Sequence, residues 1–188
     1  RWKAQPHLEL GTWERAGAAL VAPCTSAEIW TLNLPGGEVS AGGTAYYERV
    51  FAPDEAVPDG AIPVQPGTSA GQVYRTDAGA FIGWQYRAAG YGSRVHQILA
   101  DSRTWDTSAF PDGFFDTILI DGGHASDVVT SDTDKALRLL RPGGLMIWHD
   151  FCPIGSVVSQ SAATRGVVAA LHKIWRRWSP LFDELMWI

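Results

Sequence analysis

The chain has 188 residues, of which 46% are hydrophobic and 19% are charged, and its formal net charge is −5. At roughly 100–200 residues per domain, this length predicts a single domain over residues 1–188, and the apolar content excludes a disordered chain. No basic run favours a nucleic-acid partner, and no apolar run approaches the ~18 residues that would span a membrane.

The cysteines and the N-terminal residues indicate the compartment. Cys24 and Cys152 lie far apart and lack zinc-site spacing, so we expect free thiols in a reducing compartment. The first residues contain no apolar leader segment before a strand-like stretch begins. The sequence therefore predicts a cytoplasmic protein.

The first elements form a strand, a helix and a second strand. Residues 7–10 are short and mostly apolar and run into a turn at Gly11, which predicts a strand. Alanine-rich residues 16–22 predict a helix that ends before Pro23, and residues 28–32 predict the next strand. Because such a unit almost always has a right-handed crossover, it predicts a parallel sheet.

A long surface loop is predicted over residues 35–71. Prolines and clustered glycines interrupt any periodicity there, and loops of this length usually act as lids or binding loops. Tyr46, Tyr47 and Phe51 face a substrate or anchor the loop, and we expect them to anchor it.

The second half alternates strands and helices. This alternation predicts an α/β fold, a Rossmann-like three-layer sandwich around a mostly parallel, doubly wound sheet. A strand at the end of the chain would also offer an edge for pairing with a second copy in a homodimer. The expected strands are 94–99, 115–120, 145–148 and 182–188, and the expected helices are 77–89, 126–140 and 166–178.

Polar side chains follow the ends of the predicted parallel strands, where open α/β sheets bind ligands. Helix capping explains Glu9 or Asp101 taken alone, and a hydrogen-bonded turn explains His149 with Asp150. Their convergence on one sheet edge favours a site instead. The candidate residues are Glu9, Leu10, Gly11, Thr12, Asn33, Asp101, Ser102, Asp121, His124, His149 and Asp150.

These residues give the chain a resemblance to the class I S-adenosylmethionine-dependent methyltransferases. It is similar to the small-molecule branch, in which a strand ends in Asp-Gly-Gly-His and is followed by a helix, Arg-Pro-Gly-Gly, a strand and His-Asp-Phe. The matching segments are 121–124, 141–144 and 149–151. The resemblance covers most of the chain outside the predicted loop, and no counterpart of the family's seventh strand is expected.

The resemblance implies a role for each residue of the cofactor site. Glu9, Leu10, Gly11 and Thr12 match the first motif, which lies near the methionine end of the cofactor. Asn33 stands where the family usually has an acid for the ribose hydroxyls. The same resemblance places Asp101, with Ser102 beside it, at the adenine, and Asp121 at the shared rim.

Two departures from the family pattern affect the cofactor site. The first motif reads Gly11-Thr12-Trp13-Glu14 where the family has a glycine-rich turn, so Trp13 would crowd the cofactor unless it turns outward. Asn33 is neutral, and a neutral hydrogen bond contributes ~0.5–1.5 kcal/mol against ~1.5–3 kcal/mol for a charged one. We therefore expect weaker cofactor binding, not its loss.

Two kinds of chemistry fit the remaining candidates. His124 or His149 is suited to remove a proton from a hydroxyl of a small-molecule acceptor. Asp121, His149 and Asp150 resemble the metal ligands of metal-dependent O-methyltransferases, although His149 stands where an acid is usual. A set that contains histidine would suit manganese, iron or zinc better than magnesium.

The leading hypothesis is therefore methyl transfer from S-adenosylmethionine to a small-molecule oxygen. One alternative is a catalytically degraded cofactor-binding or interaction module on the same fold. Another is a metal-dependent hydroxylase that resembles the cephalosporin hydroxylase group. A dehydrogenase is disfavoured because residues 11–16 do not read G-x-G-x-x-G.

Overall fold

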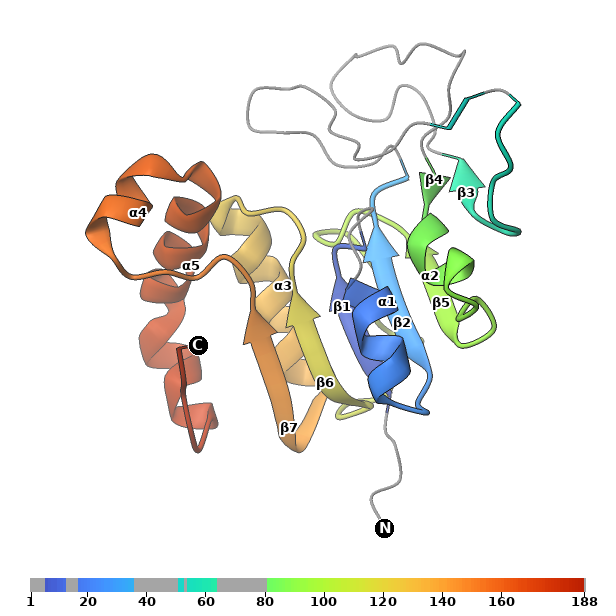
Figure 1. Ribbon diagram of the computed structural model, residues 1–188. Helices are drawn as coiled ribbons and strands as arrows, with labels where there is room; N and C mark the ends of the chain where they lie inside the picture. The colour runs from blue at the N-terminus through green and yellow to red at the C-terminus, as the bar shows by residue number, and fades with distance from the viewer. Residues whose placement is uncertain (1–5, 13–16, 36–50, 53, 64–80, 188) are drawn as a thin grey trace.

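The structure is a computed structural model that describes residues 6–12, 17–35, 51–52, 54–63 and 81–187. Its centre is a five-stranded sheet in the order β5-β2-β1-β6-β7, in which every neighbouring pair is parallel (Figure 1). The predicted parallel, doubly wound sheet is thus confirmed. The strands are β1 (His7–Leu10), β2 (Ile29–Asn33), β5 (Val95–Leu99), β6 (Phe115–Ile120) and β7 (Leu140–Trp148).

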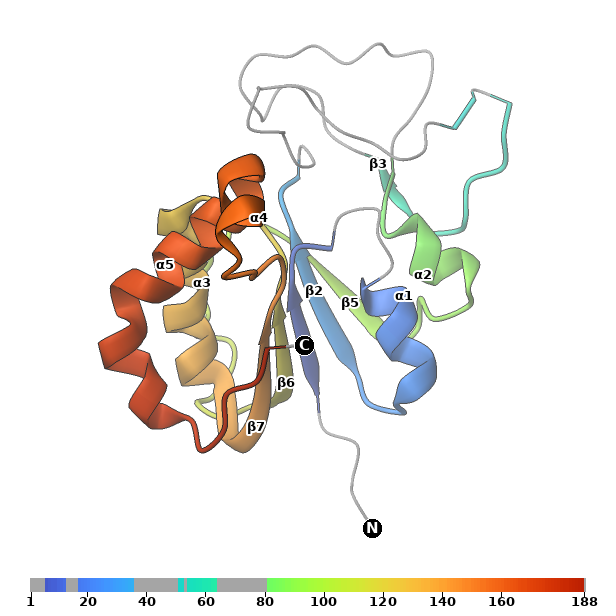
Figure 2. The same ribbon diagram turned by 60° about the vertical axis from the view of Figure 1, so that its left-hand side comes forward.

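Helices cover both faces of the sheet and make three layers (Figure 2). The layer beside β1, β2 and β5 contains the short helices α1 (Gly17–Val21) and α2 (Trp84–Ala88). The opposite layer contains α3 (Ser126–Leu139), α4 (Gly155–Gln160) and α5 (Ala162–Trp178). Single 3-10 turns follow α1 (Ala22–Cys24) and α5 (Ser179–Leu181).

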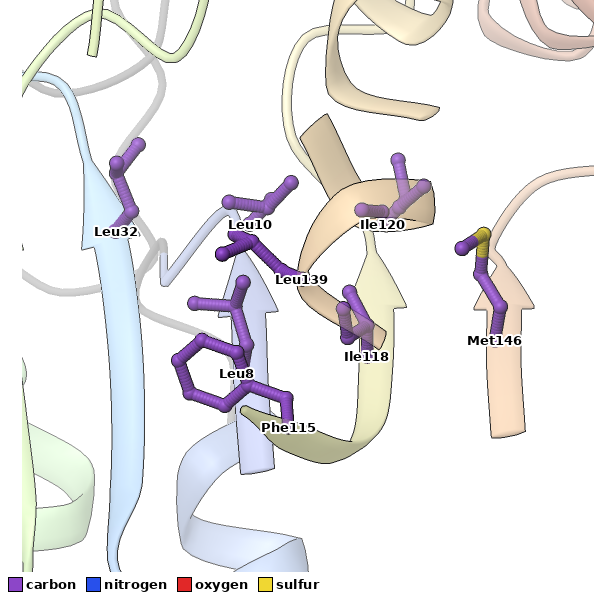
Figure 3. Close-up of a cluster of buried hydrophobic side chains, with 9 residues drawn as sticks. Leu8, Leu10, Leu32, Phe115, Ile118, Ile120, Leu139 and Met146 are labelled. Atoms are coloured by element: carbon purple, nitrogen blue, oxygen red, sulfur yellow. The ribbon is translucent and has the colours of Figure 1, made fainter. Parts of the chain in front are cut away.

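The main core lies between the sheet and α3 (Figure 3). Alternate residues of the central strands point toward this layer, as the two-residue period of a strand requires. Leu8 and Leu10 of β1 meet Ile118 and Ile120 of β6, while Leu139 approaches from α3. All five side chains are buried.

Helix α3 is amphipathic, and hydrogen bonds also attach it to the sheet. Its buried residues recur three or four positions apart, as on one helical face. Thr133 on that face accepts a hydrogen bond from Trp148 Nε1 of β7 at 3.0 Å and donates one to the carbonyl of Val129 at 2.7 Å. This link fixes α3 beside the ends of β6 and β7.

Two predicted elements are wrong. No strand forms over 182–187: Phe182 follows a 3-10 turn, and its ring packs on Trp148 and Trp178 instead of entering the sheet. The proposed homodimer edge is therefore not present in the described part of the chain. The helix predicted over 77–89 is reduced to α2, because Gly83 takes a left-handed φ of 76° before it; residues 77–80 lie outside the described residues.

The predicted loop over 35–71 is described only in part, and Tyr46 and Tyr47 lie outside the described residues. Phe51 is buried and packs edge-on against Phe81 and Trp84, so its predicted anchoring role is confirmed. Within this segment, the short strand β3 (Ile62–Pro63) pairs antiparallel with β4 (Phe81–Ile82), which lies after the predicted loop.

Most other boundaries lie within one residue of the prediction, but β7 begins five residues and α5 (Ala162–Trp178) four residues before the expected start. Helix α3 ends at Leu139, and β7 begins at once, so the 142–144 turn lies within the extended segment with Gly143 at a φ of 73°. Helix α4 was not predicted.

Cys24 and Cys152 are free thiols, as expected. Among the described helices, none is long and apolar enough to cross a membrane.

The position of the core predicts the effect of two leucine substitutions. Leu139→Ala should lower the free energy of unfolding by about 2–5 kcal/mol, because it leaves a cavity beneath the central strands. Leu20→Ala, in the exposed face of α1, should change it by less than about 0.5 kcal/mol. Urea denaturation of both variants measures the difference, and equal effects would contradict this assignment of the core.

Candidate cofactor and polar site

The strand ends meet as predicted, and backbone hydrogen bonds hold them together. The backbone amide of Gly11 donates to the carbonyl oxygen of Leu32 at 2.8 Å. The backbone amide of Asp121 donates to the carbonyl oxygen of Leu10, also at 2.8 Å. Beside them, the amide of His149 donates to the carbonyl of Ile120 at 3.0 Å. The candidate residues from β1, β2, β6 and β7 therefore lie along one edge of the sheet.

A pocket of about 200 Å³ lies at this edge. Of the predicted cofactor residues, it is lined by Leu10, Gly11, Asn33, Asp101 and Ser102. The other lining residues are Leu32, Leu34, Ala100, Arg103, Gly122, Gly123, Val128 and Asp132. A larger and shallower hollow of about 570 Å³ borders α3 and α5, and it contains none of the predicted residues.

Gly11 is required for the turn that ends β1. Its φ is +109°, a conformation that side chains strongly disfavour, and a Cβ there would lie 2.2 Å from the backbone oxygen of Asp121. The backbone at Gly11 therefore lies so close to the end of β6 that only glycine fits at this position. Trp13 lies outside the described residues.

Glu9 and Thr12 are buried next to the pocket and do not line it. Gln97 Nε2 donates to Thr12 Oγ1 at 2.9 Å, Thr12 and Thr31 share a hydrogen bond at 2.6 Å, and Thr31 Oγ1 donates to Glu9 Oε2 at 2.8 Å. With these directions fixed, Thr12 donates to Thr31. The network joins β1, β2 and β5 below the strand ends.

Burial raises the pKa of Glu9 to about 8, even though the Thr31 hydroxyl and the Ala18 amide lower it. Gly17 at the start of α1 makes room for the carboxyl group, since a Cβ there would lie 1.5 Å from Glu9 Oε1. Glu9 is thus protonated and structural at neutral pH in this structure.

Asp101 forms an ion pair with Arg103. Arg103 donates from its side chain to both carboxylate oxygens, the shortest contact being 2.7 Å, and its backbone amide donates to Oδ1 at 2.9 Å. These bonds hold the pKa of Asp101 below its ordinary value. Asp101 therefore borders the pocket as one half of an ion pair.

A polar cluster on the other side of the Asp121–His124 loop brings together the predicted catalytic and metal residues. His149 Nδ1 lies 2.8 Å from Asp121 Oδ1 and 3.4 Å from Asp150 Oδ1. His124 Nε2 lies 3.0 Å from Asp150 Oδ2 and 3.9 Å from Asp121 Oδ1. The predicted convergence of these side chains is confirmed.

Backbone geometry positions both ends of this cluster. Asp150 has a φ of 56°, in the left-handed region that aspartate tolerates better than most residues. Gly166 of α5 lets that helix pack on the loop, because a Cβ there would lie 1.9 Å from the carbonyl oxygen of His124.

The cluster has donor atoms that suit a metal ion. Asp121, His124 and His149 each place one ligand atom within 4.8 Å of the others. Atoms bound to one ion at ~2.0–2.2 Å lie at most about 4.4 Å apart. Asp121 Oδ1 lies within that distance of both His149 Nδ1, at 2.8 Å, and His124 Nε2, at 3.9 Å. His124 Nε2 is buried and makes no hydrogen bond of good geometry, despite its short distance to Asp150.

Asp132 lines the pocket but is not among the residues predicted from the sequence, because its position in an amphipathic helix indicates only a favourable interaction with the helix dipole. It is fully buried, and burial raises its pKa to about 6. The sequence does contain one signal for Asp132, because this acid occupies a position of the helical period at which an apolar residue is expected.

Open doubly wound sheets bind ligands beyond the carboxyl ends of their strands, which is where this pocket lies. The family model for a methyltransferase domain matches residues 44–151, more than half of the 188 residues. The chain belongs to this methyltransferase family. The predicted class, S-adenosylmethionine-dependent methyltransferase of class I, is confirmed at the level of family and fold.

Solved structures with low sequence identity are also similar to the chain. One is the crystal structure of the [4+2]-cyclase SpnF, with 15% identity, a TM-score of 0.39, and coverage of 76% of this chain and 37% of that one. Another is a putative S-adenosylmethionine-dependent methyltransferase from Methanococcus maripaludis, with 11% identity, a TM-score of 0.41, and coverage of 95% and 60%. The chain thus spans less than two thirds of either protein. No curated protein matches it.

The raised pKa of Glu9 predicts a pH-dependent stability. The folded chain keeps this proton up to about pH 8, whereas a model glutamate releases it near pH 4.5, so the stabilisation is complete below pH 4.5 and is lost as pH rises toward 8. Against Glu9→Gln, the wild type should lose up to about 1.4 kcal/mol of unfolding free energy per pH unit between pH 5 and 7.5. Urea denaturation measures the unfolding free energy of both proteins at each pH. If the free energies of the wild type and Glu9→Gln changed with pH in parallel, the prediction would be wrong.

Proposed function

We propose that the protein transfers the methyl group of S-adenosylmethionine to a hydroxyl oxygen of a small molecule. The observation that carries this proposal is the division of one short loop between two sites. Gly122 and Gly123 line the pocket, while Asp121 and His124 belong to the polar cluster. A cofactor in the pocket would therefore lie beside groups able to handle the proton of an acceptor.

The pocket suits the nucleoside end of the cofactor. Its walls combine apolar side chains with close-packed glycine backbone, and Asn33 stands at the end of β2 for a ribose hydroxyl. Its volume of about 200 Å³ is below the roughly 300–1,000 Å³ of pockets that enclose whole ligands. We therefore assign only the nucleoside to it.

The chemistry assigned to the chain is positioning and proton removal. S-Adenosylmethionine supplies an electrophilic methyl group, to which the acceptor oxygen bonds as the carbon–sulfur bond breaks. His124 or His149 accepts the proton that the hydroxyl loses. Asp121 and Asp150, at 2.8 and 3.0 Å from these imidazoles, would stabilise the positive charge that results.

The same cluster would instead hold a divalent metal ion. Asp121, His124 and His149 would be ligands, with Asp150 completing the predicted set. Two imidazole donors favour manganese, iron or zinc over magnesium. Such an ion would lower the pKa of a bound hydroxyl, so that its proton could pass to solvent without a free imidazole base.

One observation favours a second candidate function. Two histidines and one carboxylate with converging ligand atoms are the donor set of non-haem iron oxygenases. A metal-dependent hydroxylase similar to the cephalosporin hydroxylase group would use this set without methyl transfer. Whether the pocket binds S-adenosylmethionine separates the two functions.

A small-molecule acceptor and a cytoplasmic location fit a chain with a net charge of −5 and free Cys24 and Cys152. The charge disfavours a nucleic-acid partner.

Cofactor binding is the direct test. Calorimetric titration with S-adenosylhomocysteine should show one site, and Asn33→Ala should weaken it by about 2- to 12-fold, the value of one neutral hydrogen bond. Gln160→Ala, which removes an exposed amide from the end of α4, is the matched control and should have no effect. No heat at millimolar ligand would exclude the methyltransferase proposal. Binding without turnover on any of a panel of hydroxylated acceptors would favour the degraded module.

Metal binding is tested separately. The wild type should bind Zn²⁺ in calorimetry and show visible Co²⁺ absorption, and His149→Ala should weaken Zn²⁺ binding beyond the roughly 10–100-fold that outer partners contribute. His96→Ala removes an exposed histidine bound to Glu28 at 2.6 Å and should bind like the wild type. A wild type that binds neither ion would leave the imidazole as the base, whereas Fe²⁺ binding without cofactor binding would favour the hydroxylase.

A further inference from the structure

The segment that follows β7 leaves the polar cluster and returns to it. It leaves at Asp150, whose Oδ2 lies 3.0 Å from His124 Nε2. It returns at Gly166 of α5, where a Cβ would lie 1.9 Å from the carbonyl oxygen of His124. The intervening residues 151–165, which include α4, are therefore attached to the cluster at both ends. Figure 1 shows α4 at the end of the sheet toward which β6 and β7 point.

Hydrogen bonds hold α4 against the start of α5. Arg165 of α5 donates from Nη1 to the carbonyl oxygens of Val158 and Ser159, at 3.3 and 2.9 Å. Ser161, which joins the two helices, accepts a hydrogen bond from the backbone amide of Thr164 at 3.1 Å. Helix α4 thus has a defined position beside the cluster, although none of its residues is buried.

The same segment presents uncharged and partly apolar surface next to two acids. Residues 151–164 contain no Asp, Glu, Lys, Arg or His. Ile154 and Val157 lie about one helical turn apart, and their exposed fractions are 48% and 39%. Within the described residues, Asp121 and Asp150 form ion pairs with histidines and with no Lys or Arg. A ligand at the cluster therefore meets aliphatic carbon on one side and negative charge on the other.

We propose that the acceptor is an uncharged molecule with an apolar body, which Ile154 and Val157 contact while its hydroxyl lies at the polar cluster. This inference rests on the proposed function and names the acceptor class for the same site. Contact with the two side chains removes apolar carbon from water and favours binding. A carboxylate or phosphate on the acceptor is disfavoured, because Asp121 and Asp150 repel it. Ile154 and Val157 are thereby specificity-determining residues.

Two phenols of similar shape test the acceptor class. The uncharged ligand is para-butylphenol, and para-hydroxyphenylbutanoate carries a carboxylate at the end of the same chain. Titrations followed by ligand-observed NMR, with and without S-adenosylhomocysteine, measure both affinities. The wild type should bind para-butylphenol at least about fourfold more tightly than the anion. Ile154→Ala should weaken para-butylphenol binding by at least about fourfold, the value of one buried methylene group.

Val157→Lys gives a readout that a merely structural change would not produce. The added cation should attract the carboxylate, so this variant should bind para-hydroxyphenylbutanoate more tightly than the wild type does and para-butylphenol more weakly. Leu181→Ala is the control, because Leu181 is a 65% exposed aliphatic residue in the 3-10 turn beyond the far end of α5. It should bind both phenols like the wild type.

The outcomes separate this inference from the proposed function. If the wild type binds the two phenols equally, if para-butylphenol shows no saturable binding, or if neither variant changes the affinities, the acceptor class is wrong even where S-adenosylhomocysteine binds. If para-butylphenol binds as expected and S-adenosylhomocysteine does not, the apolar binding surface is supported and the methyl-transfer proposal fails. Ile154 and Val157 are exposed, so both variants should unfold in urea like the wild type.

Discussion

The close contact between the ends of β1 and β6 is the constraint on which the site depends. The amide of Asp121 bonds to the carbonyl of Leu10, and Gly11 packs so near that a Cβ would lie 2.2 Å from the Asp121 oxygen. From this point the chain leaves β1 toward α1 on one face and leaves β6 toward α3 on the other. Doubly wound sheets open a ligand crevice at such a divergence, so this single contact locates both proposed sites.

The loop that follows β6 connects the two sites, because its two central residues line the pocket and its two outer residues belong to the polar cluster. Its glycines face the pocket, while Asp121 and His124 face the cluster with His149. A small displacement of this loop would change both sites together. Methyl transfer requires the cofactor and acceptor within near-attack distance, and a shared loop is a direct way to fix that distance. Gly166 lets α5 pack directly against the loop at His124, and this contact also fixes the position of the loop.

Local patterns predicted the parts of the fold that local interactions determine. The strand over 115–120 is apolar throughout, as a central parallel strand should be, and its bounds are confirmed to the residue. The terminal segment 182–188 has a similar composition, but composition carries no information about a free backbone partner, and Phe182 packs on tryptophans instead. The strand-end rule likewise located the cluster, yet it passed over Asp132 because that residue reaches the pocket from a helix.

Two buried acids, Glu9 and Asp132, show how burial alone fails to identify a ligand-binding group. Burial raises the pKa of both, to about 8 and about 6. Glu9 accepts hydrogen bonds from a hydroxyl and an amide, and its own network fixes β1, β2 and β5, so its polarity is satisfied within the fold. At Asp132 burial is again the main cause, opposed by the nearby Ser102, Lys135 and Arg103 side chains, which lower the pKa. Burial and a raised pKa therefore occur both at Glu9, which does not line the pocket, and at Asp132, which does, so neither property alone identifies a ligand-binding group.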